Sequence, residues 1–141
     1  MIAPPKSSTD RRSRQVAPEP IGSPVAIAIV SWLVPGAGHL LVGQIRKGGI
    51  FFVSLLGMFV CGVLFGGRLF PFQLSDPLVF LAALAEWALG LPALISLVTG
   101  YGQGLVVAPG YEFGNTFLIG AGLLNALVGL DAFDVATGAK R

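Results

Sequence analysis

The sequence predicts an all-α membrane protein, a small bundle of four transmembrane helices, and three observations support this fold class. First, 54% of the 141 residues are hydrophobic and only 11% are charged, whereas soluble domains carry about a quarter charged residues. Second, the apolar residues fall into four runs, each close to the length that crosses a hydrocarbon core about 30 Å thick. Third, basic residues gather near the chain ends. Between Pro20 and Ala139 they are only Arg46, Lys47 and Arg68.

The composition divides the chain into three parts. Residues 1–22 are rich in Pro, Ser and Arg, which predicts a disordered basic tail. Residues 23–137 form the predicted transmembrane domain, and residues 138–141 are a short basic end. Because the basic residues lie in a tail and in short loops rather than on one face, we expect the lipid bilayer as a partner and no nucleic acid.

The first predicted span, 24–43, is the least regular. Ser23-Pro24 is typical of a helix start, with Ser as N-cap and Pro at the first helical position. The apolar run is interrupted at residues 35–39 and resumes at 40–43. The segment is just long enough to cross the bilayer, but it can also break or re-enter, which would leave three spans. We expect it to be retained rather than cleaved as a signal peptide.

The other three predicted spans are 48–67, 78–99 and 116–135. A polar break at residues 44–47 precedes the second span, and Asp76-Pro77 repeats the cap-and-proline signal before the third. Asn115 is a candidate cap for the fourth.

The positions of Lys and Arg predict the orientation. Four spans with the N-terminus inside place seven basic residues in the cytoplasm and two outside; three spans place six inside and three outside. Both models put the N-terminus in the cytoplasm, but they leave open the side on which the C-terminus lies.

Two polar residues, Glu86 and Asn125, fall inside predicted spans. An ionised carboxylate at such depth costs at least ~2.5 kcal/mol, so Glu86 must be protonated, paired or facing water or protein. Each residue lies between small residues at four-residue spacing, which allows close helix approach. We therefore expect a hydrogen bond between Glu86 and Asn125. The alternative is that Glu86 is a proton or ion site.

Three further side chains could carry chemistry. His39 could bind a pigment or haem, but with no second ligand we expect it to cap backbone groups freed by Pro35, Gly36 and Gly38, or to pair with Glu86. Asp131 and Asp134 share one helix face, and we expect a solvated helix end rather than a metal site. No nucleophile or phosphate-binding motif occurs, so the sequence predicts no catalytic residue, no metal site and no cofactor.

The interrupted first span resembles a known signature. The stretch Pro35-Gly36-Ala37-Gly38-His39-Leu40-Leu41-Val42-Gly43, followed by Lys47-Gly48, is similar to the Pro-Gly-x-Gly-His-x-Tyr-x-Gly…Lys-Gly motif of small bacterial multi-pass proteins. These are mostly domains of unknown function and look like relatives of the two-transmembrane-helix domain family. Residues 122–134 also resemble the end of one such group. Leu41 stands where the signature usually has an aromatic residue. The resemblance implies a bacterial inner-membrane protein and no particular activity.

Together these features favour a non-enzymatic accessory or assembly subunit that acts through helix packing, with a membrane-protein partner or a second copy of itself. The alternative is a small oligomeric transporter or proton or ion conductor centred on Glu86.

Overall fold

The computed structural model describes residues 22–139, and the regular secondary structure within this range is helical. Its helices are α1 (Pro24–Leu33), α2 (Ala37–Leu41), α3 (Ile45–Leu64), α4 (Pro77–Trp87), α5 (Leu91–Thr99) and α6 (Tyr111–Ala136).

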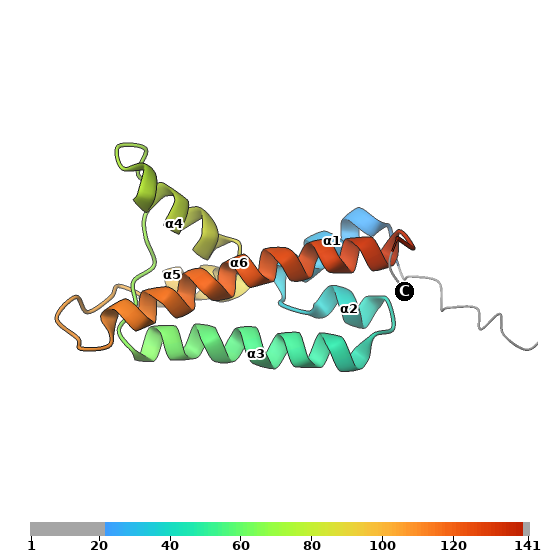
Figure 1. Ribbon diagram of the computed structural model, residues 1–141, viewed down its shortest axis with the longest axis horizontal. Helices are drawn as coiled ribbons and strands as arrows, with labels where there is room; N and C mark the ends of the chain where they lie inside the picture. The colour runs from blue at the N-terminus through green and yellow to red at the C-terminus, as the bar shows by residue number, and fades with distance from the viewer. Residues whose placement is uncertain (1–21, 140–141) are drawn as a thin grey trace, which may run out of the picture.

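The long helices α3 and α6 form the axis of the molecule. They lie side by side and run in opposite directions along its longest dimension (Figure 1). Their 20 and 26 residues correspond to about 30 and 39 Å at 1.5 Å per residue, and both are apolar enough to cross a membrane. Compared with the predicted spans, α3 begins three residues earlier and α6 five residues earlier. Arg46 and Lys47 therefore belong to the first turn of α3 rather than to a polar break.

The first predicted span is not one helix. Helix α1 has only 10 residues, about 15 Å, which is half a hydrocarbon core. It ends because Pro35 has no N–H to continue the helical ladder and Gly36 adopts a left-handed conformation with φ of 78°. The short α2 follows. Ser23 caps α1 as predicted, with its hydroxyl oxygen accepting from the Ala26 amide at 3.2 Å.

The third predicted span is also broken. Helices α4 and α5 pass the length and hydropathy test for a span only together, and they are bent by 109° at the break between them. Gly90 in the break has φ of 73°. Asp76 caps α4 as predicted, because its Oδ1 accepts from the amides of Leu78 and Val79.

The two broken segments enter from opposite ends of the α3–α6 pair. The α1–α2 hairpin lies at the end where α3 begins and α6 finishes, and the α4–α5 hairpin lies toward the other end (Figure 1). The described residues thus contain two long helices that could cross a membrane, or three spans if the bent pair counts as one, rather than four long helices.

Candidate functional site

Asn125 in the middle of α6 joins the two broken hairpins. Its fully buried side chain donates through Nδ2 to the carbonyl oxygens of Trp32 and Ala88, both at 2.9 Å. Trp32 is at the end of α1, and Ala88 is the C-cap of α4. One carboxamide therefore holds both breaks against α6.

The sequence explains why these two carbonyl groups need a donor. In a continuous helix, the amide of residue 36 would bond to Trp32, but Gly36 has left the helical conformation. The amide of residue 92 would bond to Ala88, but Pro92 has no N–H. A carbonyl group left unbonded in an apolar interior is unfavourable. Asn125 supplies the missing donors.

Glycines allow the breaks to pack closely. A Cβ at Gly90 would overlap the carbonyl oxygen of Trp32, so the two breaks touch through their backbones. A Cβ at Gly36 would overlap the carbonyl oxygen of Gly48 on α3. A Cβ at Gly38 would come within 3.0 Å of side chains on both α1 and α6. Of the remaining motif residues, Gly43 has φ of 79° and makes the turn before α3, whereas Lys47 is exposed in its first turn.

His39 bonds to a carboxylate. Its buried ring places Nε2 2.9 Å from Oδ2 of Asp131 on α6 and packs its edge against Phe51 of α3. Contrary to our expectation, Nε2 of His39 therefore does not cap a freed backbone group. The expected pairing of His39 with Glu86 is also wrong, because the carboxylate partner is Asp131. Asp131 is correspondingly not a purely solvated helix end, because it anchors α2. Among the described residues, no three His, Cys, Asp or Glu side chains are grouped to hold a metal ion.

Glu86 and Asn115 fasten the loop that leaves α3. Oε2 of Glu86 accepts from the Phe70 amide at 2.7 Å, and Oδ1 of Asn115 accepts from the Arg68 amide at 2.8 Å. The predicted Glu86–Asn125 hydrogen bond is not formed. Asn115 lies inside α6 rather than capping it.

Helices α4 and α6 still pack face to face, but through a different residue. A Cβ at Gly122 would overlap the carbonyl oxygen of Ala85. Glu86 and Asn125 lie beside this contact, one residue after Ala85 and three residues after Gly122, and they bond to separate backbone partners.

Three buried oxygen atoms of the hairpins and α6 have no hydrogen-bond partner within the described residues. They are Oγ of Ser31, Oε1 of Glu86 and Oδ1 of Asn125. Ser31 directly precedes Trp32 in the last turn of α1, and Glu86 directly precedes Trp87 in the last turn of α4. The first helix of each hairpin therefore carries a buried polar residue in its last turn.

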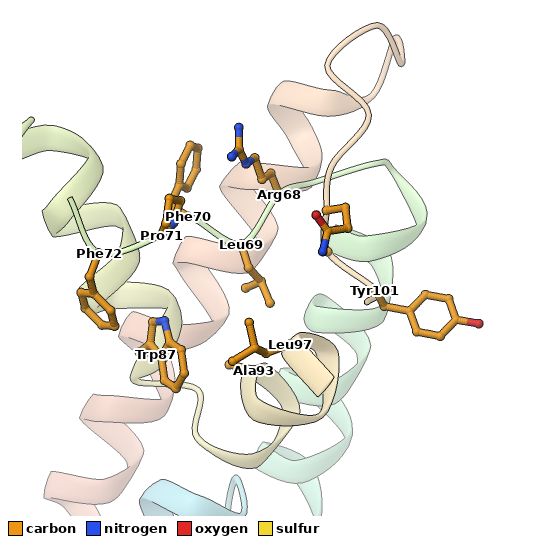
Figure 2. Close-up of a pocket in the computed structure, with 11 residues that line it drawn as sticks. Arg68, Leu69, Phe70, Pro71, Phe72, Trp87, Ala93, Leu97 and Tyr101 are labelled. Atoms are coloured by element: carbon orange, nitrogen blue, oxygen red, sulfur yellow. The ribbon is translucent and has the colours of Figure 1, made fainter. Parts of the chain in front are cut away.

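Two cavities are lined by Phe70, whose amide donates to Glu86. The first, of about 260 Å³, is enclosed by the loop from Arg68 to Phe72, the loop from Tyr101 to Gln103, and helices α4 and α5. Leu69 points toward Ala93 and Leu97 in this cavity, whereas the hydroxyl of Tyr101 points away from it (Figure 2). The second, of about 300 Å³, is a groove between α4 and α6. Phe70 lines both.

Sequence reasoning found Glu86, Asn125, His39 and Asp131 as polar residues but missed their partners. The groups it missed are backbone atoms of Trp32, Phe70 and Ala88. One local signal existed: Pro92, four residues after Ala88, has no N–H, so the Ala88 carbonyl group was predictably without a helical donor.

Two long apolar helices and two short broken hairpins define the class: a small all-helical protein with the features of an integral membrane protein. The model of the family of unknown function DUF6677 matches residues 26–141, and the chain belongs to that family. No curated protein and no solved structure matches the chain.

Proposed function

We propose that this protein is a membrane-embedded accessory or assembly subunit that acts through helix packing and carries out no catalysis. The observation that carries the proposal is a difference between the interior and the surface: the polar side chains inside hold the fold together, and they leave a face of α3 uncovered. The bonded atoms of Asn125, His39 and Glu86 hold the hairpins and the loop after α3 in place. The outward face of α3 is apolar and open.

That outward face suits another helix. Gly49 and Gly57 of α3 have no atom within 4 Å of where a Cβ would stand. Val53, four residues from each, is 70% exposed, and Cys61, one turn beyond Gly57, is exposed as well. Small residues at four-residue spacing let helix backbones approach closely in a membrane. A membrane-protein helix or a second copy of α3 fits this face.

Native mass spectrometry of the protein purified from its own membrane in mild detergent tests the proposal. We expect a complex with a membrane protein or a second copy, and its loss in Gly57→Leu, at a position where a Cβ meets no described atom within 4 Å. Leu130→Phe on the exposed face of α6 is the matched control. If a second copy is bound, oxidative cross-linking through Cys61 gives a dimer. A monomer with nothing attached contradicts the proposal.

We also propose a topology with two crossings, α3 and α6, and two re-entrant hairpins. In this arrangement both chain ends and the start of α3 lie on one side, and the loop after α3 lies on the other. Eight of the nine basic residues then share one side, with Arg68 alone opposite. The positive-inside rule makes the first side cytoplasmic, here of a bacterial inner membrane. This distribution is more uneven than that of either model predicted from the sequence.

A second candidate function is a small oligomeric conductor of protons or ions centred on Glu86. The specific observation in its favour is a carboxyl group that is 1% exposed and has one oxygen atom without a partner in the part of the chain that the structure describes. Flux into liposomes from the wild type, abolished by Glu86→Gln, is the expected result. Absence of flux from the wild type contradicts it.

A further inference from the structure

The groove between α4 and α6 leads toward Glu86. Val79 and Ala82 line its α4 wall and precede Glu86 by seven and four residues, so all three share one helix face. The opposite wall is α6, with Glu112, Asn115 and Thr116. Glu112 is exposed, so the groove carries polar groups between the surface and the region of Glu86.

Glu86 is connected to this groove and to the first cavity through Phe70. Its Oε2 accepts from the amide of Phe70, which lines both spaces, and the neighbouring Trp87 lines the first cavity. The other oxygen atom, Oε1, is buried and has no hydrogen-bond partner among the described residues. Because Oε2 makes the hydrogen bond to Phe70, Oε1 can gain or lose a proton without breaking that bond.

We propose that Glu86 is a proton-binding site that exchanges protons with water through the α4–α6 groove. The proton adds to Oε1 and leaves by the same oxygen, while Oε2 keeps its hydrogen bond. Among the described residues, the charged or titratable groups that line these two spaces are Glu112 in the groove and Arg68 and Tyr101 in the first cavity. A proton suits the site better than a metal cation, because a cation needs several oxygen ligands and Oε1 is the unpartnered oxygen that Glu86 offers.

This inference deepens the second candidate function, and it is tested by a reaction that does not require conduction. Dicyclohexylcarbodiimide, an apolar reagent, adds to a protonated carboxyl group in an apolar environment. The carboxylate oxygen bonds to the carbodiimide carbon, and the proton moves to a nitrogen atom. Mass spectrometry of the full-length protein in native membranes then locates the added mass.

We expect labelling at Glu86 that decreases as the pH rises and that is lost in Glu86→Gln. Glutamine retains a carbonyl oxygen for the Phe70 amide, so this variant keeps the fold. Glu112→Gln is the matched control and should leave the label on Glu86. If wild-type Glu86 is not labelled at any pH, the proposal is overturned. If Na⁺ at constant pH protects Glu86 from labelling, the site binds a cation, and the assignment of a proton as its ligand is overturned.

The groove itself is tested by filling it. Ala82→Phe places a ring in the groove one turn before Glu86, whereas Leu84→Phe adds the same ring on an exposed face of α4. We expect slower labelling in Ala82→Phe alone; equal rates in both variants would overturn the access route. If Glu86 is labelled but the wild-type protein gives no flux in liposomes, the proton-binding site is supported and the conducting function is contradicted.

Discussion

At the scale of single residues, the polar side chains of the interior compensate for helix breaks. Asn125 donates to the carbonyl oxygens of Trp32 and Ala88, and Glu86 accepts from the amide of Phe70. Hydropathy alone shows that such residues need partners, because no water is available in a bilayer core. It does not show which partners, because the bonded groups are backbone atoms 16 to 93 residues away.

Replacing Asn125 tests this role. Asn125→Leu removes two donors while keeping similar volume, so we expect the free energy of unfolding in detergent to fall by roughly 1–3 kcal/mol, given the strength of hydrogen bonds in membrane proteins. Leu124→Ala, at an exposed neighbouring position, is the control and should cost less. Equal losses would mean that Asn125 contributes only packing.

Gly122 gives a second prediction at this scale. Gly122→Ala forces a Cβ into the carbonyl oxygen of Ala85 and must separate α4 from α6. Gly57→Ala meets no atom within 4 Å and should stabilise α3 by up to about 1 kcal/mol, because Ala favours helix. We expect thermal unfolding temperatures to move in opposite directions. A stabilising Gly122→Ala would contradict the close packing.

At the scale of elements, the two broken hairpins are the main difference from the predicted bundle. The run 78–99 is apolar on average despite Glu86, and this average hides the break at Gly90 and Pro92. A helix bends there by 109° only because other parts of the chain satisfy the groups released. The local sequence therefore permits the break, and packing against α6 makes it stable.

Contact between the hairpins can be measured with two glycines. Gly90 and Gly100 both have positive φ, 73° and 76°, but ψ is −126° at Gly90 and 4° at Gly100. Alanine at the left-handed Gly100 should cost roughly 1–2 kcal/mol in backbone strain, and alanine at Gly90, which lies outside the left-handed helical region, should cost more. Gly90→Ala also overlaps the carbonyl oxygen of Trp32, whereas nothing lies within 4 Å at Gly100. We expect the free energy of unfolding to fall further in Gly90→Ala. Similar losses would show that the hairpins do not press against each other.

At the scale of the whole molecule, the paired re-entrant hairpins determine the proposed topology. The α1–α2 hairpin returns to the end of the α3–α6 pair from which it started, and the α4–α5 hairpin does the same at the opposite end (Figure 1). The proposed topology therefore has two crossings, keeps Arg46 and Lys47 on the side of the N-terminus, and returns the C-terminus to that side.

Cysteine accessibility distinguishes this topology from the others. In a Cys61→Ser background, we expect Ile45→Cys, at a position that is 73% exposed, to react with an impermeant maleimide only from the cytoplasmic side. Ser75→Cys should react only from the outside, and a C-terminal tag should be cytoplasmic. Four full spans would reverse the first two results. Three spans with only the first segment re-entrant would place the tag outside.

The sequence by itself determined the all-helical class, the two long apolar helices and the caps at Ser23 and Asp76, because these depend on residues close together in the chain. It also identified Glu86 and Asn125, since a polar residue stands out in an apolar run. Only the tertiary structure decided their partners, the bending of two predicted spans and the meeting of both breaks at Asn125. Those features depend on backbone groups brought together by close glycine packing, and an apolar run has the same composition whether its helix crosses or turns back.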